Sequence, residues 1–412
     1  MRHIIKPLFR HRMMPLLVVL QVALACAIAC NALFLLQQKL VPIVTPDGVG
    51  NPDRLVVAWN IAPRGQPWPS SRLNQVVSEL RAIPGVTSAS VAGSFPMETM
   101  AQMNGNVLGE GAHPARASAA VYIGTHLRDT LGLKLVAGRD FSATEEAVAY
   151  KNIGLDASGP VIITRALADR LFPGGDALGH VVRIGDQPDA GQRTVIGVVE
   201  HLMRNKFGQD DREDIDYSLL FPGIPSNWPV PIFAVRSRSA AEADSVLKAV
   251  KATITRELGP DMIQGMDPTY ESYGSLRDHM LAQSKAAVWL LSGVSLIVLL
   301  VTVVGIMGLT SYWVQQRTRQ IGIRRALGAR RANILRDVQL ENLLVVGAGI
   351  LLGMVLAYAI NLWLMHHYEL TRLPWTYLPY GAALMLLLGQ FAVLSPALRA
   401  SRVPPVVATR SV

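Results

Sequence analysis

The sequence contains very little cysteine, which limits the covalent chemistry open to it. Only Cys26 and Cys30 occur among 412 residues, and both lie in an uncharged stretch near the amino end. Four residues apart, they share one face of a helix, and we interpret them as packed thiols. The long polar segment that follows has no cysteine, so a disulfide framework is excluded there.

The motifs of common nucleotide-binding and hydrolytic enzymes are also missing. No GxxxxGKS or GxxxxGKT loop occurs, so these residues cannot cradle ATP phosphates by the Walker mechanism. No HExxH, GxSxG or CxxC pattern occurs, and the nine histidines lack ligand partners at motif spacing. The acidic run from Asp210 to Asp216 lacks the glycine and the final glutamate of an EF-hand, so we interpret it as a solvated loop. We predict no catalytic, cofactor-binding or metal site, and no enzyme activity, in this chain.

Charge is absent from four long apolar stretches, residues 13–37, 286–315, 342–366 and 377–398. Each is long enough to cross about 30 Å of hydrocarbon as a helix. We therefore predict a membrane protein with four transmembrane α-helices and one large polar domain, residues 38–284, between the first two. The first stretch is preceded by basic residues like a signal peptide, but its apolar core is longer and no clean cleavage site follows. We expect it to stay uncleaved.

The polar residues inside these stretches are few and uncharged. The main ones are Gln21, Asn31, Asn361 and Gln390. We interpret them as interhelical hydrogen-bonding groups. The lack of an intramembrane acid or base argues against a carrier coupled to an ion gradient. The glycines predicted to allow close helix contact in the third stretch are Gly347, Gly349 and Gly353.

The positive charge is concentrated in three short segments. The net charge is +9 and the pI is about 9.7. The excess of basic residues lies in residues 1–12, 316–341 and 399–412, whereas residues 38–285 hold 24 basic and 27 acidic side chains. Because Lys and Arg accumulate on the cytoplasmic side of membrane proteins, we predict both termini and the 316–341 loop to be cytoplasmic. The polar domain and the loop 367–376 then face outwards. Nucleic-acid binding would instead place the basic patch on the folded domain.

Hydrophobic patterning predicts an α+β fold for the polar domain. Two similar strand–helix–strand units are predicted, at 54–59, 71–80 and 86–91, and at 232–235, 240–258 and 262–265. Between them lies a β-rich insert, about 115–225. Its predicted strands are 119–123, 161–164, 181–184 and 194–199.

The 316–341 loop has order beyond its charge. It holds seven arginines and only two acids. Ile321, Ile323 and Leu327 recur between the arginines at near-helical spacing, and we expect them to anchor a short amphipathic helix. Gly328 follows where a helix C′ residue adopts the left-handed conformation. A second helical pattern then continues into the third apolar stretch.

The segment from Arg317 to Ala329, Arg-Thr-Arg-Gln-Ile-Gly-Ile-Arg-Arg-Ala-Leu-Gly-Ala, resembles the signature of the FtsX-like permease domain of MacB-like ABC transporters. In that family it forms a coupling helix that docks on a cytoplasmic ATPase. Gln320 stands where the family usually has glutamate. The residues that the resemblance assigns to ATPase coupling are Arg317, Arg319, Gln320, Ile321, Gly322, Ile323, Arg324, Arg325, Ala326, Leu327, Gly328 and Ala329. It implies that the arginines contact the ATPase surface.

Other stretches extend the resemblance over most of the chain. Residues 138–141, 166–179 and 195–199 are similar to the MacB-like periplasmic core domain. The tail is similar to the family's basic C-terminal motif, although Leu398 and Val407 depart from the usual arginine and glutamate.

The resemblance implies a permease subunit in the bacterial inner membrane. The chain begins twelve residues before its first apolar stretch, so the ATPase, with its ATP and Mg²⁺, is expected in a separate subunit. Two ATPase sites imply a dimer of permeases, with homodimer and heterodimer both open. Movement of the coupling helix would pass through the first two spans to the periplasmic domain, a mechanism called mechanotransmission, and drive export of a periplasmic substrate. A periplasmic adaptor and an outer-membrane channel are further candidate partners.

Two other functions stay open at this point. An FtsX-like regulator would use the outer domain to bind a cell-wall hydrolase, and a lipoprotein-releasing permease would bind acylated proteins. The similarity of the polar domain to the MacB-like core favours export.

Overall fold

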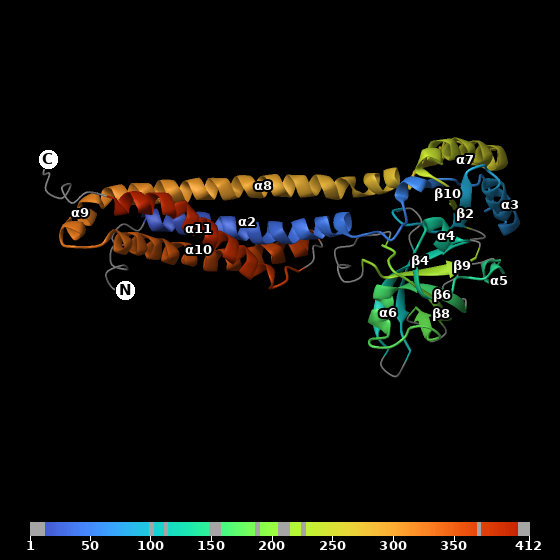
Figure 1. Cartoon of the computed structure of the whole chain (residues 1–412), viewed down its shortest axis with the longest axis horizontal. Helices are drawn as coiled ribbons and strands as arrows, with labels where there is room; N and C mark the ends of the chain where they lie inside the picture. Colours follow the sequence, from blue (N-terminus) through green and yellow to red (C-terminus); the bar gives the residue numbers. More distant parts are fainter. Residues whose placement is uncertain are drawn as a thin grey trace. The chain divides into compact units, whose positions relative to one another are not determined.

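The structure is a computed structural model of the chain, and Figure 1 shows its elements. The residues that it describes are 13–98, 103–110, 114–147, 158–185, 190–204, 215–223, 228–368 and 372–402. The chain forms two compact units. We call residues 1–41 and 284–412 the helical unit and residues 42–283 the sheet unit. Two helices, α2 (Met13–Val44) and α8 (Tyr273–Gln316), contribute residues to both.

Among the described residues, four helices are long and apolar enough to cross a membrane, and their apolar stretches belong to the helical unit. Besides α2 and α8 these are α10 (Arg331–Tyr368) and α11 (Tyr377–Ser401). The short helix α9 (Thr318–Ala326) lies between α8 and α10. The helices extend beyond the uncharged stretches, most clearly at the start of α8 and of α10. The length of an apolar stretch matches only the thickness of the hydrocarbon core. The backbone hydrogen bonds of a helix can continue beyond it into polar sequence, so the helix is longer than the stretch.

Two of the three predicted packing glycines lie at a helix contact. A Cβ atom at Gly349 would be 2.8 Å from Val22, and one at Gly353 would be 2.6 Å from Cys26, both on α2. No described atom outside its own helix lies within 4 Å of a Cβ placed on Gly347. Gly347 therefore makes no close helix contact with the described residues of this chain, because residues two apart point to opposite sides of a helix. Cys26 is a buried free thiol packed beside Gly353, which agrees with its interpretation as a packed thiol.

Three of the four polar residues predicted to bond between helices make hydrogen bonds inside the helical unit. The Gln21 amide donates to a backbone carbonyl of α8 and the Asn31 amide to one of α10, each at 3.1 Å. The Asn361 side chain does not bridge two helices, since its oxygen accepts the backbone N–H of Leu373 in the following loop at 2.8 Å. The buried amide nitrogen of Gln390 has no hydrogen-bond partner among the described residues.

The described residues of the sheet unit form eleven strands in one hydrogen-bonded network. The strands are β1 (Leu55–Trp59), β2 (Val86–Ala92), β3 (Asn104–Leu108), β4 (Arg116–Gly124), β5 (Leu135–Gly138), β6 (Gly159–Thr164), β7 (Val181–Ile184), β8 (Gly191–Val199), β9 (Ser218–Pro222), β10 (Ile232–Ser237) and β11 (Thr269–Ser272). The helices are α3 (Ser70–Arg81), α4 (Leu127–Leu131), α5 (Ala143–Glu146), α6 (Arg165–Leu171) and α7 (Ala243–Leu258). Three 3₁₀ turns cover Pro52–Arg54, Ala240–Glu242 and Gly259–Asp261.

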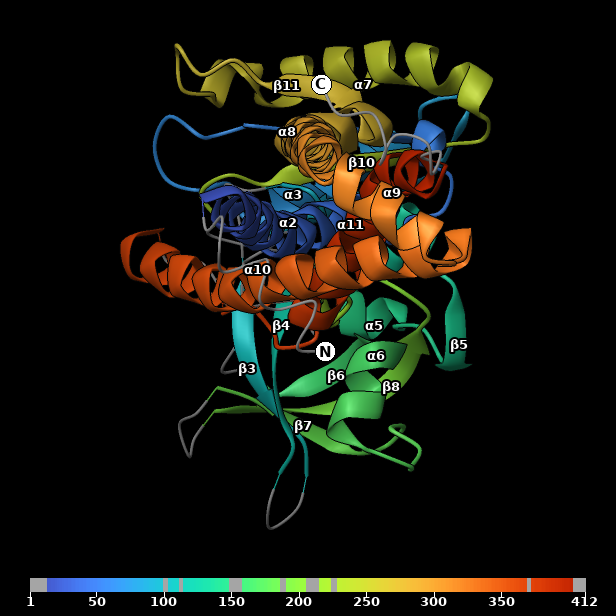
Figure 2. The same cartoon turned by 90° about the vertical axis from the view of Figure 1, so that its left-hand side faces the viewer.

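The network has an open part and a closed part. The open part has the antiparallel order β11-β1-β10-β2. The closed part runs β4-β3-β7-β8-β6-β9 and returns to β4 through the parallel β4–β9 pair, with β5 added to β8. We call the closed part the strand ring, and its strands β3, β4, β6, β7 and β8 are labelled in Figure 2. The two parts meet where β2 pairs with β4, at Ala92 and Gly124. An α+β fold with a β-rich insert follows, as the patterning predicted.

Apolar residues on both faces of β1 place this strand between two cores. In β1, Val56 and Ala58 pack with residues of α3 and α7, whereas Leu55 and Val57 face a second core that includes Leu202. Strands covered on both faces are apolar at successive positions instead of alternating with polar residues. This is why the short apolar runs of β1 and β10 were recognisable in the sequence.

One predicted strand is wrong. Residues 262–265 follow a 3₁₀ turn and form no strand, and Met262 makes only an isolated bridge with Pro63. Gly265 has a φ of +90°, which breaks an extended run. The strand in this region is β11, which pairs with β1. The predicted patterns also missed β3, β5 and β9, whose short runs lack clear alternation.

Candidate functional site

The candidate site is the turn that carries α9 between α8 and α10. The helical path breaks at Arg317, which has φ −102° and ψ 6°. The helix α9 ends in a Schellman turn: Gly328 has φ +94°, its N–H donates to the carbonyl of Arg325, and the N–H of Ala329 donates to that of Arg324, both at 3.1 Å. The prediction for Gly328 is therefore confirmed. The turn gives α9 fixed ends and a defined direction.

Only one of the three apolar side chains of α9 anchors it. Ile321 is buried and packs in a core with Ile334 and Val338 of α10. Ile323 is 44% exposed and Leu327 is 83% exposed. The expectation that all three anchor the helix is corrected: Ile323 lies two positions from Ile321 and so on the opposite side, and Leu327 follows the last residue of α9. The anchoring face and an exposed apolar face are thus separate.

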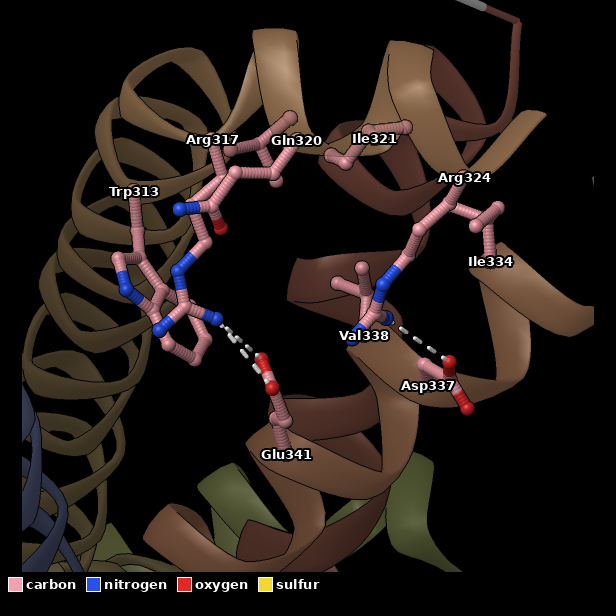
Figure 3. Close-up of a pocket in the computed structure, with 10 residues that line it drawn as sticks. Trp313, Arg317, Gln320, Ile321, Arg324, Ile334, Asp337, Val338 and Glu341 are labelled. Carbon is pink, nitrogen blue, oxygen red and sulfur yellow. Dashed lines mark hydrogen bonds and ion pairs between the residues drawn. The ribbon is translucent and has the colours of Figure 1, made fainter. Parts of the chain in front are cut away.

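Two arginines of the motif bind acids at the start of α10 (Figure 3). A guanidinium nitrogen of Arg317 lies 3.2 Å from the carboxylate of Glu341, and its guanidinium carbon lies 4.0 Å from the ring centre of Trp313. Arg324 lies 3.6 Å from Asp337. Asp337 and Glu341 are four residues apart, so one face of α10 presents both. The two pairs hold α9 against α10.

A cavity of about 70 Å³ lies between these side chains. Its lining includes both ion pairs, Ile321 and Gln320, whose amide lies beside Arg317 in Figure 3. The cavity thus brings charged and apolar side chains of α8, α9 and α10 together.

The twelve predicted coupling residues divide by exposure. Gly322 is buried like Ile321, and Arg317, Arg325 and Ala329 are half-buried. The exposed ones are Arg319, Gln320, Ile323, Arg324, Ala326, Leu327 and Gly328. Sequence reasoning missed Trp313, Asp337 and Glu341. The two acids had a signal, since they are the only ones in a loop of seven arginines and lie one helical turn apart.

The acidic run of the sheet unit lies mostly outside the described residues. Its last member, Asp216, accepts a hydrogen bond from the backbone N–H of Leu202 and contacts Nδ1 of His201, both at 2.8 Å. Burial raises the pKa of the Asp216 carboxyl. Among the described residues, no group of three or more His, Cys, Asp or Glu side chains could hold a metal ion.

Comparisons with known proteins cover both units. Residues 292–405 match the family described as FtsX-like permease C-terminal, and residues 42–253 match the MacB-like periplasmic core domain. Three relatives carry the name macrolide export ATP-binding/permease protein MacB. The protein of Chromobacterium violaceum is 27% identical over 59% of this chain and 35% of its own length. That of Neisseria meningitidis serogroup A is 29% identical over 60% and 36%, and that of Azoarcus sp. 29% over 67% and 40%.

Solved structures resemble the sheet unit more distantly. The periplasmic region of MacB from Actinobacillus actinomycetemcomitans has 14% identity and a TM-score of 0.36, covering 58% of this chain and 97% of that one. The extracellular domain of the transporter YknZ from Gram-positive bacteria has 14% identity and a TM-score of 0.33, covering 53% and 98%. The chain spans between a third and two fifths of the length of the MacB relatives. With both family matches and four apolar helices in place, the chain belongs to the MacB-like and FtsX-like family of ABC transporter permeases.

Proposed function

We propose that this chain is the permease subunit of an ABC transporter that works by mechanotransmission. A partner ATPase hydrolyses ATP and moves α9, and the long helices carry that movement to the sheet unit on the other side of the membrane. The sheet unit then drives export of a substrate already in the periplasm. The family assignment supports the proposal, and the 412 residues contain no P-loop of their own.

One observation carries the proposal: α9 presents apolar side chains to solvent while the rest of the helix is held in place. Leu327 and Ile323 are exposed, whereas Ile321 is buried and two arginines are paired with α10. Apolar groups ringed by charge typify the centre of a protein interface. A helix fixed in this way offers its partner a surface that needs no ordering on binding.

The charge pattern supports a cytoplasmic position for this surface. The arginines between α8 and α10 follow the excess of Lys and Arg found in cytoplasmic loops. Arg319, Arg330, Arg331 and Arg336 are exposed. Exposed cations of this kind speed the encounter with an acidic partner surface more than they add affinity.

The test is purification of the full chain from its native membrane in mild detergent, with mass spectrometry of the proteins that co-elute. We expect an ABC ATPase and, if the transporter is a heterodimer, a second permease. Co-elution of a cell-wall hydrolase would instead favour a regulatory role. Absence of an ATPase, under conditions that preserve other membrane complexes, would overturn the proposal.

A substitution sharpens this test. Leu327→Asp should abolish stimulation of the partner's ATPase activity and leave membrane insertion intact, because the side chain is exposed in the free subunit. The matched control is Ala332→Asp, an exposed position in the first turn of α10 where a carboxylate is favourable. Unchanged stimulation by Leu327→Asp would remove α9 from the docking surface.

A further inference from the structure

The carboxylate of Asp47 ties the segment after α2 to the first turns of α8, within the sheet unit. Its Oδ1 accepts the backbone N–H of Val49 at 3.1 Å. Its Oδ2 accepts the Tyr273 hydroxyl at 3.2 Å and forms an ion pair with Nε of Arg277 at 3.1 Å. Tyr273 and Arg277 are one turn apart and share a face of α8. The Asp47 side chain is only 12% exposed, so solvent screens these contacts weakly.

The same segment also contacts the connection between β8 and β9. The backbone carbonyl of Asp47 accepts the N–H of Met203 at 3.0 Å. Gly48 has a φ of +85°, and a Cβ there would lie 2.0 Å from the carbonyl oxygen of His201. The carbonyl of Met203 in turn accepts the Tyr122 hydroxyl of β4 at 2.8 Å. Residues 201–203 therefore link the segment to the strand ring.

Packing fixes the α8 side of this junction. Tyr273 is completely buried, and its ring meets that of Phe95 edge-on at 6.1 Å between centroids.

At the far end of the segment, the buried guanidinium of Arg236 donates to the carbonyls of Gly50 and Thr130, at 2.7 and 2.6 Å. Buried groups with several partners resist small displacements, because each displacement leaves a polar atom unpaired.

We propose that Asp47 is a positioning residue that makes the end of α2, the start of α8 and residues 201–203 move as one body. A displacement of either helix is then passed to the strand ring through Met203 and Tyr122. This inference rests on the proposed function, and it goes beyond it by placing the transfer of movement at one side chain.

The chain offers a matched control in Glu271 of β11. Its side chain is 11% exposed and also pairs with a base on α8, since it lies 3.3 Å from Nδ1 of His279. It accepts the indole N–H of Trp59 at 3.1 Å. These partners lie on α8 and β1 and not on the segment after α2 or on residues 201–203. Replacing Glu271 therefore removes a comparable acid without cutting the proposed path.

The experiment uses the full chain with its co-purified ATPase in lipid nanodiscs. Hydrogen exchange of the peptide covering residues 199–204 is measured with and without ATP plus vanadate, beside the ATPase rate. We expect an ATP-dependent change in the unaltered chain. Asp47→Ala should reduce that change by about five-fold or more, the lower end of coupling between sites, with the stimulated ATPase rate retained. Glu271→Ala should keep both.

A second variant covers the case in which Asp47→Ala does not fold. Tyr273→Phe removes one hydroxyl and keeps the ring packed, so it should reduce the ATP-dependent change less than Asp47→Ala does. A full change in both variants at normal ATPase rates would overturn the inference and leave the proposed function standing. If Glu271→Ala lost as much of the ATP-dependent change in exchange as Asp47→Ala, Asp47 would have only a general stabilising role, and the inference would be overturned. No ATP-dependent change in the unaltered chain would overturn both proposals.

Discussion

Helix α8 is held in different ways at its two ends. Its first turn is fixed by a completely buried Tyr273 and by an ion pair to Asp47, which is nearly buried. Beyond its last turn, α9 keeps one isoleucine buried and leaves Leu327 to solvent. The contacts that a chain makes with itself favour burial, whereas a surface meant for a partner must stay exposed until the partner arrives. We call the buried contacts of Asp47 with Tyr273 and Arg277 the closed junction of α8, and the turn with α9 and the exposed Leu327 its open junction.

The largest effect is expected from a substitution that changes the backbone of the closed junction. Gly48→Ala places a Cβ against the His201 carbonyl in a left-handed conformation. We expect a loss of about 2 kcal/mol or more in the stability of the sheet unit. The melting temperature should fall by about 4–8 °C, as followed by thermal unfolding of the full chain in detergent.

The control for that variant is Gly65→Ala. A Cβ there has no described atom within 4 Å, and its φ lies outside the left-handed range. We expect a change within about 0.5 kcal/mol. Equal effects of the two variants would mean that the segment after α2 is loosely packed, contrary to the closed junction described here.

The two ion pairs of the open junction, Arg317 with Glu341 and Arg324 with Asp337, are expected to differ in strength. The Arg317 side chain is 20% exposed and stacks on Trp313, so Arg317→Gln should lower the stability by about 1–2 kcal/mol. The side chain of Arg324 is 56% exposed, so Arg324→Gln should cost about 0.2–1 kcal/mol, and raised salt should weaken that pair first. Thermal unfolding at low and high salt measures both. If the two substitutions lowered the stability equally, with the same dependence on salt, Arg317 would not be the stronger of the two contacts.

The smallest effect tests whether burial, and not membership of the sheet unit, sets the strength of a contact. Arg139 and Glu145 form an exposed two-pronged pair in that unit, at 2.8 Å on both arms. The hydrogen bonds from Arg139 lower the pKa of Glu145 to about 2. A carboxylate with a lowered pKa stabilises the fold above its ordinary pKa of about 4.5, and that stability is lost as pH falls towards 2.

Because the pair is exposed, we expect the loss between those pH values to stay below about 1 kcal/mol. Glu145→Gln should remove this part of the pH dependence in a series of melting curves, and Glu79→Gln provides a control at another exposed acid. A larger loss would show that exposure does not weaken contacts in this unit.

Local signals predicted much of the fold. The four spans follow from uncharged stretches, and β1, α3 and β2 follow from apolar periodicity. Gly328 was recognisable because a helix end that needs a positive φ selects glycine. The motif from Arg317 to Ala329 located the candidate site, but it did not show which of its side chains are buried.

Short stretches of sequence were enough to show which segments are apolar enough for a membrane, where α9 ends and where strands such as β1 and β2 lie, because each depends on residues within a few positions of one another. Only the tertiary structure decided that the strand ring closes through β4 and β9. The same holds for the contact of Gly349, but not Gly347, with α2. It also holds for the bond from Arg317 to Glu341, and for the bond from Tyr273 to Asp47, which lies 226 positions away in the sequence. Such contacts depend on how distant elements pack, and no local pattern of residues encodes that choice.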